Sequence, residues 1–110
     1  MVKFVKGDVV ALPFPFSDLS ATKRRPALVV ATLPGDDVIL CQITSRAVAH
    51  NHAIGIAASD FADGSLHQDS SVRPDRLFTA DSGLILYRAG GLSAIKVQEV
   101  VARIVALITA

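Results

Sequence analysis

The sequence predicts a mainly β (α+β) fold: a small, strongly bent sheet or open barrel of short antiparallel strands, with a C-terminal helix against it. Two observations support this prediction. Short apolar runs recur along the first four fifths of the chain, and turns rich in proline, glycine or aspartate separate them. The spacing of apolar residues then changes to a helical period near the C-terminus. We expect one domain, 1–110, because this length suffices for a single core.

The first strands follow from apolar runs and from proline chemistry. A strand is expected over 8–12, followed by an extended Pro-Phe-Pro-Phe segment that lies at a sheet edge or leaves the sheet, because proline cannot donate a ladder hydrogen bond. The runs 26–32 and 37–44 flank a turn with Pro34 and Gly35. This pattern predicts a β-hairpin.

The second half of the chain predicts shorter strands and the helix. Strand segments are expected over 53–58, over 71–81 with a break at Pro74, and over 84–88, which Gly90-Gly91 closes; 59–70 reads as an acidic loop. Ser93 is a plausible N-cap of the C-terminal helix. Its apolar stripe comprises Ile95, Val97, Val100, Val101, Ile104, Val105 and Ile108.

Composition restricts the function classes. The formal net charge is only +1, so any nucleic-acid binding must come from local clusters of charge. The single cysteine, Cys41, cannot form an internal disulfide, and no apolar run approaches the length of a membrane span. The N-terminal residues also lack a signal-peptide pattern. We therefore expect a cytoplasmic protein with no membrane association.

Polar residues interrupt the apolar pattern at three predicted strand ends. Arg25 precedes Pro26, which favours extended backbone at Arg25 and fixes where its side chain begins. Thr44 ends the strand 37–44, and Arg73 and Asp75 stand in the sequence Val-Arg-Pro-Asp-Arg. Each feature alone is typical of a solvated arginine, a strand terminus or a surface ion pair.

Together these residues predict a site for phosphate chemistry. Strand ends converge in a small sheet, and a guanidinium binds phosphate through parallel hydrogen bonds. Two arginines, a hydroxyl and a carboxylate suffice for metal-free RNA cleavage. In that reaction the ribose 2′-OH attacks the adjacent phosphate and needs a base, an acid and cations.

Other chemistries have weaker support. The run His50-Asn51-His52 and the group His67, Asp63 and Asp69 lack metal-ligand spacing, so we expect no metal and no other cofactor. Cys41 alternates with Ile39 and Ile43, which indicates core packing rather than a nucleophile.

The order of motifs resembles the PemK/MazF family of toxins from type II toxin–antitoxin systems. "KGDVVALPFPFSDLSATKRRPALVV", "DVILCQITS" and "SLHQDSSVRPDRLFTAD" carry the resemblance, which covers roughly residues 6–108. It implies an SH3-like barrel that forms a homodimer, a cognate antitoxin that covers the RNA groove, and a complex of both that binds operator DNA. It also implies a metal-independent endoribonuclease that cleaves single-stranded RNA, with mRNA as the expected substrate, and so inhibits growth.

The resemblance assigns roles by position. The arginine before proline that contacts the scissile phosphate falls on Arg25, and the strand-end threonine falls on Thr44. The acid and base of some members fall on Arg73 and Asp75. Further RNA contacts are expected from Lys23, Arg24, Ser45, Arg46 and Ser71.

Two alternatives remain open at this point. The same fold supports non-catalytic toxins that act on DNA gyrase, and fold alone does not determine function. Those relatives act through an exposed C-terminal segment, whereas the apolar "VARIVALITA" favours core packing here. A degenerate domain that only binds a partner peptide is the third possibility.

Overall fold

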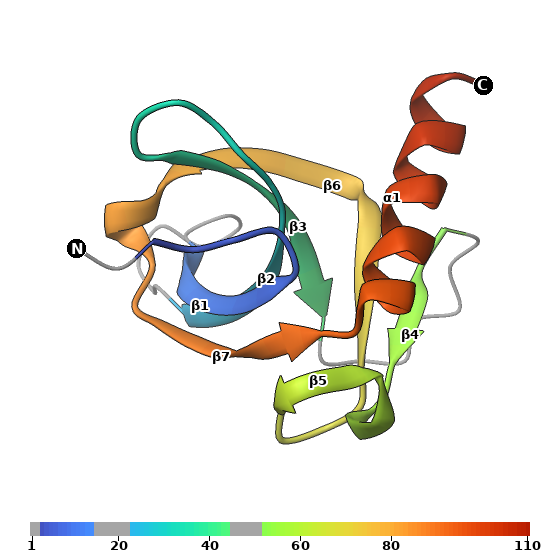
Figure 1. Cartoon of the computed structure of the whole chain (residues 1–110), viewed down its shortest axis with the longest axis horizontal. Helices are drawn as coiled ribbons and strands as arrows, with labels where there is room; N and C mark the ends of the chain where they lie inside the picture. The colour runs from blue at the N-terminus through green and yellow to red at the C-terminus, as the bar shows by residue number, and fades with distance from the viewer. Residues whose placement is uncertain (1–2, 15–22, 45–51) are drawn as a thin grey trace.

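The structure, a computed structural model, describes residues 3–14, 23–44 and 52–110; the side chains of Phe14 and Lys23 also lie outside the description. Within these residues the chain forms a seven-stranded antiparallel sheet that curls into a half-barrel, with one helix at its C-terminal end (Figure 1). The strand order is β4-β6-β3-β2-β1-β7-β5. The predicted mainly β fold with a C-terminal helix is therefore confirmed.

The elements follow one another along the chain with short connections. They are β1 (Asp8–Phe14), β2 (Lys23–Thr32), β3 (Asp37–Thr44), β4 (Ile54–Ile56), the 3-10 turn η1 (Ala58–Asp60), β5 (Phe61–Gly64), β6 (Ser70–Asp81), the 3-10 turn η2 (Ser82–Leu84), β7 (Tyr87–Leu92) and α1 (Ala94–Ile108).

The curled sheet buries side chains on both faces. One cluster packs Leu28, Ile43 and Val72 of the sheet with Val100 of α1, all fully buried. The other lies on the opposite face of β1, β2 and β3 and includes Leu12, Ala27, Val29 and Leu40. Side chains alternate between the two faces of a strand, so the nearly continuous apolar runs of β2 and β3 reflect burial on both faces.

The expected hairpin is confirmed as β2 and β3, although β2 begins three residues earlier than predicted and so includes Arg25. Pro13 is compatible with β1 because β7 pairs with β1 only from Asp8 to Ala11. Beyond Ala11, β1 has no ladder partner on its β7 side and is an edge strand there. An edge tolerates proline because proline cannot donate a ladder hydrogen bond.

Three predicted boundaries in the second half were wrong. The expected loop 59–70 contains β5 and the last two residues of η1. β6 is one strand through Pro74, although a bulge at residues 73–76 interrupts its ladder with β3 there. The expected strand 84–88 instead begins at Tyr87 and continues through Gly90 and Gly91. These glycines fit because β5 approaches closely: a Cβ on Gly90 would lie 2.5 Å from the carbonyl oxygen of Asp63.

The helix α1 begins at the predicted cap. The Ser93 hydroxyl accepts a hydrogen bond from the Lys96 amide at 3.3 Å. Of the predicted apolar stripe, Val97, Val100 and Ile104 are buried, and Val101 packs beside them. The outer members of the stripe, Ile95 and Ile108, are 81% and 72% exposed, so the buried face is narrower than the sequence pattern predicted.

Candidate functional site

Arg25 and Thr44 lie at the same end of the β2–β3 pair. The ladder between these strands places Ala27 opposite Gln42, and two residues further along each antiparallel strand stand Arg25 and Thr44. Arg25 is paired with buried Leu12 of β1, which places it on the face of the sheet that carries Leu12, Ala27 and Leu40. Both Arg25 and Thr44 are half-buried.

Ser71 continues this row onto the next strand. It lies directly opposite Thr44 in the β3–β6 ladder and opposite Gly55 in the β4–β6 ladder. Ser71 is only 6% exposed, and with Ser70 it lines a small cavity of about 220 Å³ between β4 and β6. Arg25, Thr44 and Ser71 therefore occupy neighbouring positions on three adjacent strands.

Arg73 and Asp75 lie in a bulge of β6 beside this row. Between the pairs Ile43–Val72 and Cys41–Leu77, β3 contributes the single residue Gln42 and β6 contributes the four residues 73–76. The Arg73 guanidinium donates from Nε and Nη2 to the two carboxylate oxygens of Asp75, at 3.1 and 2.9 Å. This hydrogen bonding, with the charge of Asp75, raises the pKa of Arg73. The predicted proton-transfer pair is thus a bidentate ion pair in this structure.

Two consecutive β3 residues contact the bulge from opposite faces. The Cys41 thiol donates to the Arg73 carbonyl at 3.0 Å, and the amide oxygen of Gln42 accepts from Arg76 Nη1 at 3.4 Å. Burial of Cys41, with a smaller effect of the Asp75 charge, raises the pKa of this thiol to about 12. The predicted core role of Cys41 is confirmed. Sequence reasoning did not select Gln42 and Arg76, although a polar residue inside the apolar run 37–44 was an available signal.

The remaining predicted RNA contacts are only partly described. Ser45 and Arg46 lie outside the described residues. Lys23 is placed by its backbone, opposite Phe14, and exposed Arg24 lies opposite Pro13. Because neighbouring residues alternate between faces, Arg24 points to the opposite side of β2 from Arg25.

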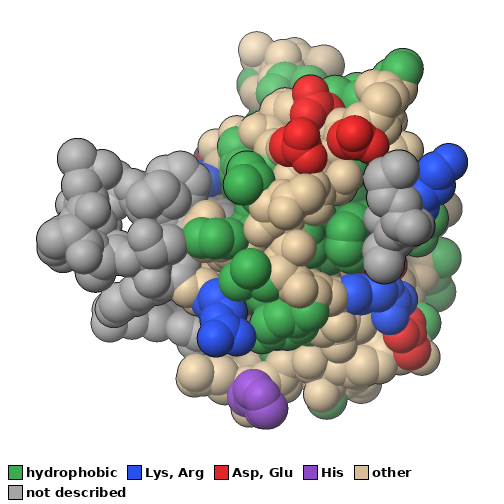
Figure 2. Space-filling view, turned by 90° about the vertical axis from the view of Figure 1, so that its left-hand side faces the viewer, with side chains coloured by type: hydrophobic (Ala, Val, Ile, Leu, Met, Phe, Trp, Pro, Cys, Tyr) green, Lys and Arg blue, Asp and Glu red, His purple; other side chains and the backbone are tan. Residues whose placement is uncertain are grey.

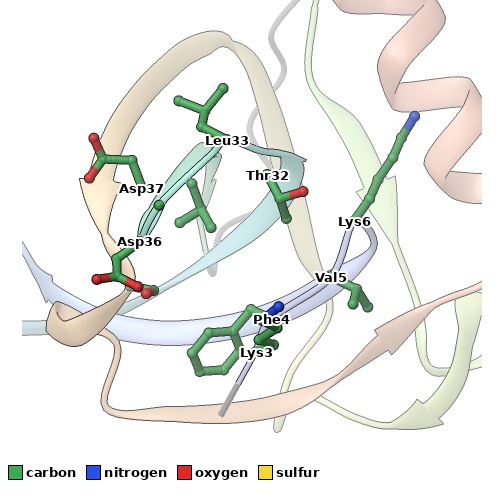
Figure 3. Close-up of a pocket in the computed structure, with 11 residues that line it drawn as sticks. Lys3, Phe4, Val5, Lys6, Thr32, Leu33, Asp36 and Asp37 are labelled. Atoms are coloured by element: carbon green, nitrogen blue, oxygen red, sulfur yellow. The ribbon is translucent and has the colours of Figure 1, made fainter. Parts of the chain in front are cut away.

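The larger depression drawn in Figure 3 lies at the other end of the same strands. It has a volume of about 310 Å³ and is lined by the β2–β3 turn and the segment 3–6. Asp36 and Asp37 lie on one side of it and Lys3 on the other, whereas the Lys6 side chain extends away toward α1. Figure 2 shows this side of the molecule, where acidic side chains gather near the top and another acidic side chain lies beside a basic one at the lower right. This mixture of charge is a poorer match to a polyanion than the arginine-rich opposite end.

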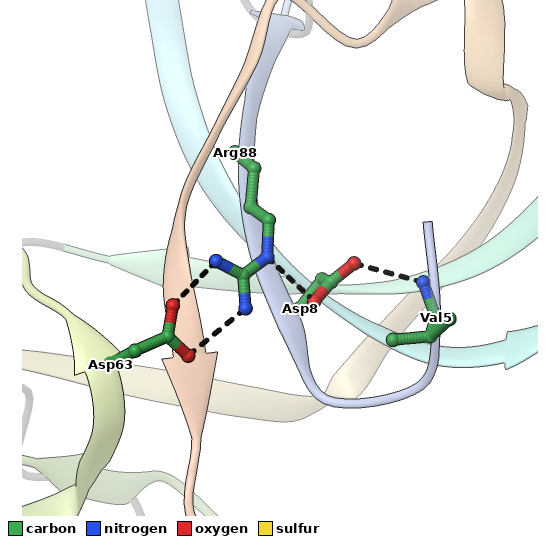
Figure 4. Close-up of polar contacts among 4 residues, drawn as sticks. All are labelled: Val5, Asp8, Asp63 and Arg88. Atoms are coloured by element: carbon green, nitrogen blue, oxygen red, sulfur yellow. Dashed lines mark hydrogen bonds and ion pairs between the residues drawn. The ribbon is translucent and has the colours of Figure 1, made fainter. Parts of the chain in front are cut away.

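A separate charged cluster connects β1, β5 and β7 (Figure 4). Arg88 binds Asp63 through two hydrogen bonds of 2.6 and 3.0 Å, and its Nε donates to Asp8 at 2.9 Å. The second oxygen of Asp8, which is 4% exposed, accepts from the Val5 amide at 2.8 Å. The hydrogen bonds from Arg88 lower the pKa of Asp63, and the hydrogen bonds to Asp63 and to Asp8 raise the pKa of Arg88. Each of these hydrogen bonds joins two protein groups, which is typical of a structural role.

Neither metal ligation nor a membrane span is evident in the described segments. They contain no group of three or more histidine, cysteine, aspartate or glutamate side chains that could hold a metal ion. None of the helices in these segments has the length and apolar character needed to cross a bilayer.

Comparison with solved structures supports the fold. The chain is similar to MazF from Deinococcus radiodurans, with 21% identity, full coverage of both chains and a TM-score of 0.79. It is also similar to a MazE–MazF complex from the same organism, with 21% identity, 96% of each chain and a TM-score of 0.77. An endoribonuclease in complex with its cognate antitoxin from Mycobacterial species matches at 13% identity, with 97% of this chain, 96% of that chain and a TM-score of 0.76.

Sequence comparison identifies the family. No curated protein matches this chain in sequence. The family model of the PemK-like, MazF-like toxins of type II toxin–antitoxin systems matches residues 5–108, which is nearly the whole chain. With the fold and the motif order above, this match shows that the chain belongs to the PemK-like, MazF-like toxin family.

Proposed function

We propose that this chain is a metal-independent endoribonuclease toxin that cleaves single-stranded RNA, with mRNA as the substrate that accounts for growth inhibition. Residues 1–110 would act as a single toxin domain in the cytoplasm. The observation that carries the proposal is the row of Arg25, Thr44 and Ser71 across β2, β3 and β6, next to the Arg73–Asp75 pair. The row combines a guanidinium and hydroxyls with a carboxylate beside them, as phosphodiester transesterification requires.

In the proposed reaction the ribose 2′-oxygen forms a bond to phosphorus and the bond from phosphorus to the 5′-oxygen breaks. The products are a 2′,3′-cyclic phosphate and a 5′-hydroxyl end. Arg25 and Thr44 bind the non-bridging oxygens, where negative charge grows in the transition state. Asp75 accepts the proton of the 2′-OH, and Arg73 gives a proton to the leaving 5′-oxygen. The proton on Asp75 then passes to Arg73 through their hydrogen bonds, which restores the ion pair.

The proposed partners are a cognate antitoxin and a second copy of the chain. One similar structure is a MazE–MazF complex, and another is an endoribonuclease in complex with its cognate antitoxin. Ile95 and Ile108 of α1 are largely exposed, which is compatible with a covered apolar face in a homodimer. We further propose that the toxin–antitoxin complex binds operator DNA.

Cleavage of a long RNA in EDTA by the purified protein tests the proposal. We expect cleavage to persist in the chelator, to leave cyclic phosphate ends, and to fall by at least about a hundredfold in Arg25→Ala and Thr44→Ala. Lys6→Ala is the matched control, because it removes one exposed positive charge at the opposite end of the strands. Melting temperatures of all variants separate loss of function from loss of folding.

Two outcomes would overturn the proposal. Intact RNA together with gyrase trapped on DNA would favour the non-catalytic toxin. Intact RNA with binding of the antitoxin peptide alone would favour the degenerate peptide-binding module.

A further inference from the structure

The bulge of β6 presents Arg76 to a buried amide. Gln42 is 9% exposed and belongs to the same face of β3 as Thr44, two residues away. Its Oε1 accepts a hydrogen bond from Nη1 of the exposed Arg76 at 3.4 Å. A buried side-chain amide needs polar partners, so the contact restrains both groups.

The two arginines of the bulge differ in what binds them. Arg73 contacts the Asp75 carboxylate through two hydrogen bonds, which offsets most of its charge locally. Gln42, in contrast, is neutral, so its contact orients the Arg76 guanidinium without neutralising it. A guanidinium has five N–H donors, and the bond to Gln42 uses one of them. With respect to the residues that the structure describes, Arg76 therefore retains both charge and donors for an anion.

We infer that Arg76 binds a backbone phosphate of the RNA next to the scissile linkage, and that Gln42 is a positioning residue that acts through Arg76. Gln42 lies two residues from Thr44, a separation of about 6.6 Å along a strand. Arg76 beside Gln42 is therefore placed for a phosphate adjacent to the one that Arg25 and Thr44 bind. This inference rests on the proposed function and adds a substrate-binding residue to the same site.

The salt dependence of RNA binding tests the role of Arg76. The probe is a single-stranded 2′-O-methyl RNA oligonucleotide, which lacks the nucleophilic hydroxyl and stays intact during the measurement. For single strands, the slope of log affinity against log salt decreases in magnitude by about 0.7 for each phosphate that the protein no longer neutralises. We expect Arg76→Ala to reduce the slope by about this amount and to raise the KM for cleavable RNA about tenfold. Arg76→Lys should keep the slope, and Lys6→Ala should leave both values unchanged.

A double-mutant cycle tests Gln42. We expect Gln42→Leu to raise KM severalfold, while Gln42→Leu adds nothing when Arg76 is already alanine. Equal effects of Gln42→Leu in both backgrounds would show that the amide does not act through Arg76, and would overturn its positioning role. If Arg76→Ala does not fold, Arg76→Gln replaces it and keeps a polar group opposite Gln42.

The outcomes separate this inference from the proposed function. If the wild-type protein cleaves RNA and Arg76→Ala retains its slope and KM, the inference is wrong and the proposed function stands. If the wild-type protein binds the oligonucleotide but cleaves no RNA, the proposed nuclease is wrong, while the slope still decides whether Arg76 contacts phosphate. If it does neither, both fail.

Discussion

At the scale of single residues, Cys41 shows how an intrinsically reactive group becomes structural. The thiol is fully buried and its hydrogen goes to the carbonyl oxygen of Arg73, in the bulge that carries the proposed proton-transfer pair. Burial raises its pKa to about 12, so the reactive thiolate is scarce at neutral pH. The contact helps to hold the backbone of the bulge, and the burial of Cys41 predicts an unreactive thiol.

This environment predicts the labelling behaviour of Cys41. In native protein at pH ~8, alkylation by iodoacetamide should proceed at least about a hundredfold more slowly than in protein unfolded by guanidinium chloride. Mass spectrometry of the alkylated fraction against time gives both rates. Native labelling as fast as in the unfolded chain would mean that the thiol is accessible and the bulge opens readily.

At the scale of elements, the predictable parts are those with local signals. The hairpin of β2 and β3 follows from two apolar runs and a proline–glycine turn, and Ser93 marks the start of α1. The strand β5 consists of only the four residues Phe-Ala-Asp-Gly, and its pairing with β7 depends on residues more than twenty positions away. No periodicity within β5 itself could predict it.

The candidate functional site likewise has a part that the sequence predicts and a part that it does not. The Arg25–Pro26 step and the polar end of β3 were visible in the sequence, and these residues converge at one end of the sheet. The β6 bulge is a register shift between Cys41–Leu77 and Ile43–Val72, which exists only once β3 and β6 are paired. Gln42 and Arg76 owe their contact to that shift, so their relation could not be read from either segment alone.

The close approach of β5 and β7 predicts a specific cost at Gly64. Gly64 and Gly35 both have positive φ, +68° and +86°. A Cβ on Gly64 would lie 2.6 Å from the Cα of Gly90 and would also meet the Ala89 carbonyl, whereas a Cβ on Gly35 would meet no atom of the described structure within 4 Å. Both alanine variants should lose about 1 kcal/mol from backbone strain, and Gly64→Ala should lose at least about 1 kcal/mol more from overpacking.

Urea unfolding of the two glycine variants measures this difference, because Gly35→Ala supplies the conformational cost without the steric one. Equal losses of unfolding free energy would mean that β5 moves away from β7 at little cost. In that case the pairing of β5 with β7 would contribute little to the stability of the sheet.

At the scale of the whole molecule, the Arg88 cluster joins segments that are distant in the chain. Arg88 of β7 contacts Asp8 of β1 across 80 positions and Asp63 of β5 across 25. The Asp8 carboxylate is buried and receives hydrogen bonds from both Arg88 and the Val5 amide. Removal of Arg88 would leave that buried carboxylate without its cation, which is costlier than removal of an exposed partner. We therefore expect Arg88→Met to destabilise the fold more than Asp63→Asn, as urea unfolding of both variants would measure.

The same cluster predicts an acid-dependent loss of stability. The hydrogen bonds from Arg88 lower the pKa of Asp63 in the folded state, so the folded protein releases this proton more readily than the unfolded chain. The resulting stabilisation is present above the ordinary aspartate pKa, about 3.9, and disappears as the pH falls through the lower folded pKa. Between pH ~5 and pH ~2, the unfolding free energy of the wild type should therefore fall more steeply than that of Asp63→Asn. Denaturant titrations across this range measure both curves. Since the effect depends on the guanidinium, Asp63→Asn introduced into Arg88→Met should leave the pH profile unchanged, and parallel profiles for wild type and Asp63→Asn would contradict the coupling.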